Sequence, residues 1–222
     1  MGKFKDFIER NGKIIEVIFS SISLLIVGVI GTTISINNSM TSRASLDLAR
    51  ANAQPAFNVQ SEFNESNTTE TLSISIESGF AENLTVKEYT VFDYFGTAND
   101  KKFSKKCVVS DYFEGHKYGN NKGSIAKMTK ENNFAIYLNL LAEVLKIDSI
   151  SGLNRNILIE ISYQDITGEN ITKYYENKGG LYYNHVAKDE AKEMLEIISN
   201  LPEVDIDTLT LNSLIVLPDT NK

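Results

Sequence analysis

The stretch Leu72-Ser73-Ile74-Ser75-Ile76-Glu77 decides the fold class, because apolar and polar residues alternate strictly along it. Alternation with a period of two places one set of side chains on a packed face and the other set in water, as in an antiparallel β-sheet. The same pattern precedes this stretch at 57–63 and recurs at 157–163. The sequence therefore predicts a domain built mainly from half-buried β-strands.

A further strand is predicted at 84–93, where the alternation changes phase. The apolar residues up to Val86 belong to one phase, and those from Tyr89 onward belong to the other. A shift of one residue is typical of a β-bulge, which inserts one extra residue into a strand. We therefore predict a bulge near Lys87-Glu88.

The other elements complete a mainly β (α+β) fold. The segments 134–145 and 187–200 have apolar residues at helical spacing, which predicts two amphipathic helices. Asp165-Ile166-Thr167-Gly168 predicts a hairpin turn, since Asp can cap it and Gly can adopt the left-handed conformation. Further strands are predicted at 107–113, 124–128, 171–175, 181–186 and 209–217. Seven to nine short strands with two inserted helices favour an antiparallel β-sandwich.

The segment Val17–Ile36, VIFSSISLLIVGVIGTTISI, contains no charged residue. As a helix it would span ~30 Å, the hydrocarbon thickness of a bilayer. It is also longer than the ~7–15 apolar residues of a cleaved signal peptide. We therefore predict a retained signal-anchor helix. The predicted order is an amphipathic, basic N-terminus (1–13), a transmembrane helix (14–36), a juxtamembrane helical connector (37–54) and a β-rich soluble domain (55–222).

Charge separates the predicted parts and orients the anchor. The 222-residue chain has a net charge of −7. Residues 1–54 carry six basic and four acidic residues, so the acidic excess lies beyond them. Four Lys and Arg precede the span and two follow it closely, which favours a cytoplasmic N-terminus and an extracytoplasmic domain at the cell membrane. The acidic domain argues against a nucleic-acid partner.

One face of the predicted span is lined by small residues. Ser21, Gly28, Gly31, Thr32 and Ser35 share this face at helical spacing. Small side chains let two helix backbones approach closely in lipid, so the face could mediate homo-oligomerisation. The alternative is that Gly, Ser and Thr are simply tolerated in a membrane helix.

The sequence contains no recognisable catalytic, cofactor or metal motif. Its one cysteine, Cys107, lies in an apolar alternating run and reads as a buried core thiol. Of the two histidines, His116 lies in a Gly/Asn/Lys-rich loop and His185 precedes a helix. We therefore expect no cofactor, no metal and no enzymatic activity, although a fold could still bring the two histidines and acidic residues together.

Two groups of side chains are candidates for a partner surface. The first is a basic loop, which could contact an anionic ligand or partner or could be an ordinary hairpin connection. The second is a set of two tyrosine pairs on either side of Gly179-Gly180. One ring of each pair should face outward, which could form an exposed aromatic cluster, and the alternative is that the rings serve only core and edge packing. The candidate residues are His116, Lys117, Tyr118, Lys122, Tyr174, Tyr175, Tyr182 and Tyr183.

Two motifs resemble those of uncharacterised bacterial single-pass membrane proteins with a short juxtamembrane helix and a small β-rich domain. The first is the run AQPAFNV at 53–59, which follows the Ala-rich segment 42–53, and the second is the hairpin ISYQDITG at 161–168. The resemblance implies an anchored β-rich domain and carries no assigned activity.

Together these features favour a membrane-anchored binding, sensor or interaction subunit that recognises another protein. An alternative is a membrane-perturbing oligomeric effector, for example of a bacterial defence system, assembled through the small-residue face. The two differ in whether function requires Gly28 and Gly31 to remain small. An enzyme is the third class, and it would require a catalytic cluster assembled by the fold.

Overall fold

The computed structural model describes Val29, Thr32 and residues 34–49, 51, 53–64, 66, 68–117, 122–180 and 182–220. The chain divides into two compact units, Met1–Asn52 and Ala53–Lys222. In the first unit, residues 34–49 are helical and their side chains are exposed. No helix in the described part of the chain is long and apolar enough to cross a membrane. Most of the predicted span, 17–36, lies outside the described residues.

The second unit is mainly β, as the alternation predicts. Its strands are β1 (Ala56–Asn64), β2 (Thr69–Ser78), β3 (Glu82–Ala98), β4 (Lys101–Ser110), β5 (Gly115–Lys117), β6 (Gly123–Thr129), β7 (Ile150–Gln164), β8 (Asn170–Asn177), β9 (Asn184–Val186) and β10 (Glu203–Asp205). Its helices are α2 (Asn133–Val144), α3 (Lys188–Ser199), the 3-10 helix η1 (Ile206–Thr208) and α4 (Leu211–Ile215).

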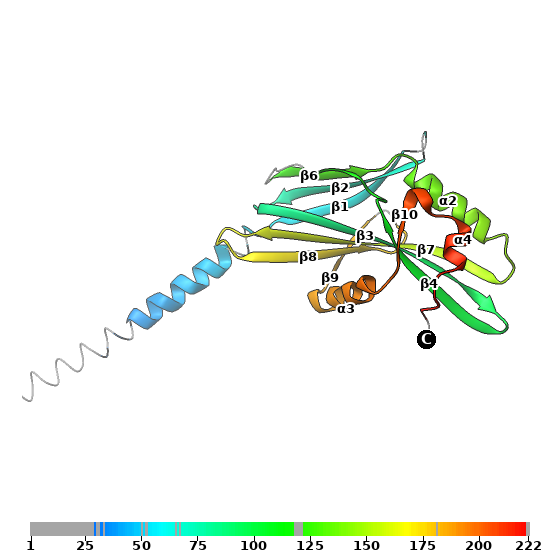
Figure 1. Ribbon diagram of the computed structural model, residues 1–222. Coiled ribbons are helices and arrows are strands. Elements are labelled where there is room, and N and C mark those ends of the chain that lie inside the picture. Colours follow the sequence, from blue (N-terminus) through cyan, green and yellow to red (C-terminus); the bar gives the residue numbers. More distant parts are fainter. Residues whose placement is uncertain are drawn as a thin grey trace, which may run out of the picture. The chain divides into compact units, whose positions relative to one another are not determined.

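The strands form two sheets that share one core. One sheet has the order β1-β2-β6-β5 and the other has the order β10-β4-β3-β7-β8-β9. Every pairing is antiparallel except that of β10 with β4. Figure 1 shows β1, β2 and β6 in one layer above β3, β7 and β8. Inward side chains of both layers, such as Ile74, Phe92 and Ile159, belong to the same buried cluster.

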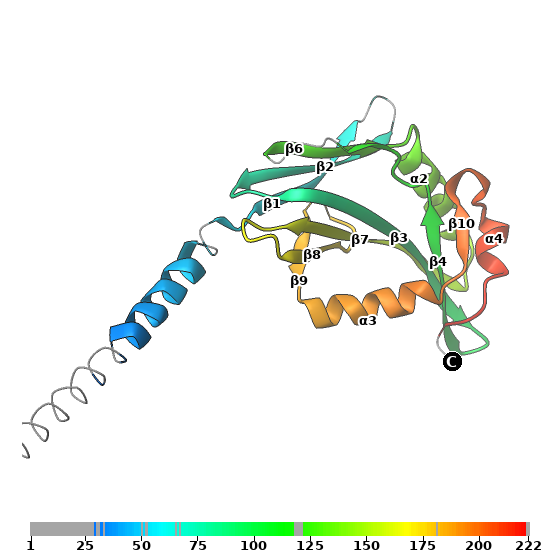
Figure 2. The ribbon, with the colours of Figure 1, turned by 60° about the vertical axis from the view of Figure 1, so that its left-hand side comes forward.

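Helix α3 covers the outer face of the six-stranded sheet, on the side away from the other layer (Figure 2). Leu158, Tyr174 and Val186 from three strands pack there against Ala191 of the helix. This explains why apolar residues occupy outward positions of β7 and β8, since the helix shields them from water. The predicted helix at 187–200 is thereby confirmed.

Of two local predictions, the hairpin turn is confirmed and the C-terminal strand is wrong. The hairpin after β7 is confirmed, because the Asp165 carboxylate accepts hydrogen bonds from backbone N–H groups of Thr167 and Glu169, and Gly168 is left-handed. The strand predicted at 209–217 is wrong, because α4 occupies it. The hydroxyl of Thr210 and that of Ser213 form a reciprocal capping box that favours a helix start. The β-rich domain therefore contains α4 and η1 in addition to the two helices that were predicted for it.

The bulge predicted near Lys87-Glu88 is also wrong. β3 pairs with β7 in unbroken register from Thr85 to Phe95, and its irregularities lie at the two ends of the strand. The period of two therefore continues through the strand. The apparent phase shift arises because two polar residues, Glu88 and Thr90, occupy inward positions that the pattern reserves for apolar residues.

Candidate functional site

Glu70, Arg155 and Glu88 are acidic or guanidinium side chains at inward strand positions of this domain. Glu70 on β2 continues the phase of the buried residues Leu72 and Ile74. Arg155 on β7 is in phase with the buried Ile157. Glu88 is the third. Since burying a charge is costly unless it is paired and hydrogen-bonded, each of the three needs a physical explanation.

Glu70 and Arg155 compensate each other across the two sheets. Glu70 is 0% exposed and Arg155 is 4% exposed, and their side chains form an ion pair. The Tyr112 hydroxyl donates to Glu70 Oε2 at 2.9 Å. The Arg155 guanidinium lies 5.4 Å from the ring centroids of Tyr112, Phe134 and Tyr137, within the range of cation–π attraction. Burial lowers the pKa of Arg155 to about 10, which still leaves it charged at neutral pH.

Asn133, at the start of α2, fixes the backbone around this pair. Its Oδ1 accepts from the Glu70 N–H at 2.8 Å, and its Nδ2 donates to the carbonyls of Glu70 and Tyr112, each at 3.0 Å. The cluster of Glu70, Tyr112, Asn133 and Arg155 therefore joins β2, the segment after β4, α2 and β7. This network is enclosed in the core, and its chemistry is structural.

Glu88 differs because no basic side chain among the described residues pairs with it. Its carboxylate accepts a hydrogen bond from the Thr90 hydroxyl. Burial raises the pKa of Glu88 from 4.5 to about 7, the Thr90 hydrogen bond opposes that rise, and the nearby Asp111 charge adds to it. A carboxyl group shifted this far by burial beside a pocket is a candidate for function.

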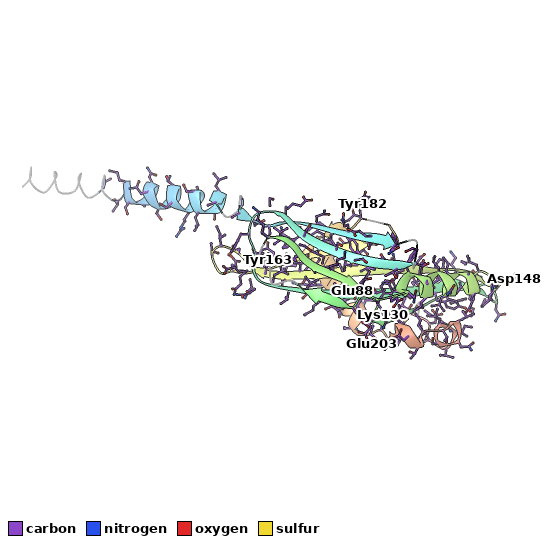
Figure 3. The ribbon with its side chains drawn as sticks, turned by 90° about the horizontal axis from the view of Figure 1, so that it is seen from above. Glu88, Lys130, Asp148, Tyr163, Tyr182 and Glu203 are labelled. Carbon is purple, nitrogen blue, oxygen red and sulfur yellow. The ribbon has the colours of Figure 1, made fainter. Side chains whose placement is uncertain are left out.

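Glu88 lines a pocket of about 440 Å³ between β3, the end of β4 and the segment that joins α3 to β10. The volume falls within the ~300–1,000 Å³ typical of ligand sites. We call it the acidic pocket, because Glu88, Asp111 and Glu203 contribute three carboxylates and the lining contains no Lys, Arg or His. Figure 3 labels Glu88 and Glu203, which both line this pocket, and also labels the nearby Lys130, which is not among the lining residues. Val109, Phe113, Ile198 and Leu201 supply apolar lining.

The chemistry of the acidic pocket suits a cation with an apolar stem. Carboxylates can accept hydrogen bonds from a Lys ammonium or an Arg guanidinium, and the apolar lining can pack against the methylene groups of those side chains. Among the described residues, no group of three or more His, Cys, Asp or Glu is arranged to hold a metal ion.

The predicted association face falls mainly outside the described residues. Ser21, Gly28 and Gly31 are not described. Thr32 and Ser35 are helical and exposed, and the Thr32 hydroxyl donates to the Val29 carbonyl at 2.9 Å. The association prediction therefore stays a prediction.

The basic loop is only partly described. His116 and Lys117 belong to β5, although their side chains lie outside the described atoms, and Tyr118 lies outside the described residues altogether. Lys122 is exposed just before β6. The basic loop as a partner surface therefore stays a prediction.

The four tyrosines do not form one exposed cluster. Tyr174 is buried beneath α3 and Tyr175 is buried in the main core, so both faces of β8 are covered. Tyr183 is half-buried, and its hydroxyl lies 3.1 Å from that of Ser61. Tyr182 alone is strongly exposed, at 76%.

Sequence reasoning missed all three carboxylates of the acidic pocket. Glu88 had a detectable signal, because it interrupts an otherwise apolar phase of β3, and that signal was interpreted as a bulge. Asp111 and Glu203 carry no such signal. They reach the pocket only because β4 ends beside β3 and β10 pairs with β4.

Comparisons with known proteins add no family assignment. No protein-family model matches the chain, and no curated protein matches it.

Proposed function

We propose that this chain is a membrane-anchored, non-enzymatic binding subunit. In this proposal its β-rich domain binds a partner protein, and a basic side chain of the partner enters the acidic pocket. In this proposal the uncharged run at 17–36 is the anchor, and the two sheets form a sandwich that serves as a rigid scaffold. The domain lies outside the cytoplasm, as the flanking charges favour.

The acidic pocket is the observation that carries this proposal. Glu88, Asp111 and Glu203 line one hollow without a basic residue among them. Like charges gathered beside apolar walls repel one another and are relieved by an incoming cation. The buried pair of Glu70 and Arg155, by contrast, is already neutralised within the chain and offers nothing to a ligand.

The binding proposal can be tested by site-specific photocrosslinking in cells. Ser199 lines the pocket and is exposed, so a photoreactive amino acid there should crosslink to the partner. The same group at the exposed Glu193 of α3, which is not among the pocket residues, serves as the control. We expect a crosslinked band at Ser199 that disappears when Glu88→Gln, Asp111→Asn and Glu203→Gln are combined. Equal bands at the two positions, or a band unaffected by the triple variant, would contradict the proposal.

The anchor has a separate test. The full-length protein should remain in the membrane fraction after carbonate extraction, whereas a chain beginning at Gln54 should be soluble. Release of the full-length protein by carbonate would contradict the anchor.

The predicted association face is tested by combining Gly28→Leu with Gly31→Leu, which should weaken self-association of the span roughly five- to thirty-fold. An unchanged oligomer would show that the small residues are merely tolerated.

A further inference from the structure

Strand β3 has two halves with different partners. Its second half, from Thr90 to Ala98, pairs with β4 on one side and with β7 on the other. Its first half pairs with β7 alone, and no strand among the described residues pairs with the opposite edge of Leu84–Tyr89. The reason lies in β4, which ends at Ser110. The chain then turns at Asp111, whose φ is 57°, and continues to the other sheet as β5.

No strand pairing in the described part of the chain uses the backbone hydrogen-bonding groups along this edge. In an antiparallel sheet, alternate residues of a strand direct their N–H and C=O groups to opposite neighbours. Alternate residues of Thr85–Tyr89, which are in regular register with β7, therefore direct theirs away from β7. Five residues correspond to ~17 Å of extended chain, the usual length of a strand. Such an edge is a template for pairing with another chain.

The acidic pocket lies at one end of the open edge. Glu88 and Tyr89 are adjacent in the strand, so their side chains point to opposite faces of the sheet. Both line the pocket, which means that the pocket wraps around the edge of β3 and does not sit on one face. A chain that paired with this edge would therefore run directly into the three carboxylates.

We propose that the partner binds by adding an extended segment to the open edge of β3, with a Lys or Arg of that segment entering the acidic pocket. This inference rests on the proposed function and specifies how the partner docks. Backbone pairing along Thr85–Tyr89 would supply affinity, and the carboxylates would select the basic side chain, as in other cases of strand addition. The negative lining disfavours a second copy of the same acidic edge as the occupant, since like charges would meet.

The test uses the full-length protein in detergent and a displayed library of random nine-residue peptides. Selection on the parent protein should enrich peptides that combine β-branched or aromatic residues with at least one Lys or Arg. The triple variant Glu88→Gln, Asp111→Asn and Glu203→Gln should bind the selected peptides roughly tenfold or more weakly. Asn suits the left-handed backbone at position 111, so this variant preserves the turn. A matched triple variant on the exposed part of α3, Asp189→Asn, Glu190→Gln and Glu193→Gln, should bind them like the parent.

Backbone methylation then separates strand addition from simple pocket binding. N-methyl groups on one alternate set of peptide amides should abolish binding, because those amides face β3, whereas methyl groups on the other set should have little effect. If both methylated peptides bind equally well and binding still needs the three carboxylates, strand addition is wrong and the proposed function stands. If no basic peptides are enriched, or the pocket variant binds like the parent, both proposals fail.

Discussion

Two carboxylates at inward strand positions of this domain, one fully buried and one partly buried, have opposite surroundings. Glu70 lies fully buried in the core, where Arg155 and Tyr112 compensate its charge. Glu88 lies beside a pocket, where Thr90 is its hydrogen-bond partner and Asp111 is its charged neighbour. Each occupies a strand position that would ordinarily hold an apolar side chain. Both interrupt the hydrophobic pattern, and only the surroundings distinguish them.

The difference shows how a buried charge can be assigned a role. A buried charge that is paired with a counter-ion of the same chain is part of the scaffold. Removing one partner leaves the other charge buried and unpaired, and its desolvation cost then destabilises the fold. A charge that finds no counter-ion, and that lines a cavity, raises the free energy of the free protein until a ligand relieves it. We therefore assign Glu70 to stability, and the proposed function gives Glu88 a role in binding.

The largest effect should come from breaking the compensated pair. Arg155→Met leaves the Glu70 carboxylate buried without its counter-ion, so we expect a loss of about 3–5 kcal/mol in the free energy of unfolding. Urea unfolding followed by circular dichroism measures it. Combining Arg155→Met with Glu70→Gln removes the orphaned charge and should recover part of the loss. A single variant within 1 kcal/mol of the parent by this measurement would show that the pair is not structural.

The uncompensated carboxylate should respond in the opposite direction. The pKa of Glu88 rises from 4.5 to about 7 on folding, so its charge destabilises the folded state above pH 7 and has no effect below about pH 4.5. Glu88→Gln should therefore stabilise the protein at pH 8 by up to about 3 kcal/mol. The gain should appear as the pH rises from about 4.5 to 7.

The control for this prediction is Glu203→Gln, because Glu203 is an exposed carboxylate of the same pocket. We expect it to change the free energy of unfolding at pH 8 much less than Glu88→Gln does, because an exposed side chain keeps its hydration. If Glu88→Gln also left it unchanged, Glu88 would be as well solvated as an ordinary surface carboxylate, and the contrast with Glu70 would disappear.

Smaller effects should follow from two neutral polar groups of the core. The Tyr137 hydroxyl donates to the Leu153 carbonyl at 3.1 Å, so Tyr137→Phe should cost about 1 kcal/mol. The Tyr163 hydroxyl is buried without a hydrogen-bond partner among the described residues. Tyr163→Phe should therefore be neutral or stabilising by up to about 1 kcal/mol in the same urea experiment. Equal losses in the two variants would show that burial without a partner carries no penalty here.

The sequence was informative wherever structure depends on neighbouring residues. Strict alternation predicted β2 and the second half of β7, helical spacing predicted α2 and α3, and Asp165 with Gly168 predicted the hairpin turn. The prediction failed at α4, where the apolar residues at 209–217 suggested a strand and the caps at Thr210 and Ser213 determined a helix.

The candidate site could not be predicted, because it depends on contacts between distant residues. Glu70 and Arg155 are 85 positions apart, and no local pattern links them. A polar residue at an inward position looks, in one sequence, the same as a change of phase, so Glu88 was interpreted as a bulge. The pocket also requires β4 to end beside β3 and the α3–β10 segment to lie nearby, and these arrangements are set by the tertiary fold.

The most direct test of the central claim is the affinity of a selected basic peptide for the full-length protein in detergent, measured by calorimetry at pH 6 and pH 8. Ionisation of Glu88 should strengthen binding to the parent as the pH rises, since its pKa lies at about 7 in the free protein. We predict that Glu88→Gln weakens binding roughly tenfold or more at pH 8 and removes most of the pH dependence, whereas Asp189→Asn changes neither. Equal affinity of the parent and Glu88→Gln at pH 8 would contradict the assignment of Glu88 to binding.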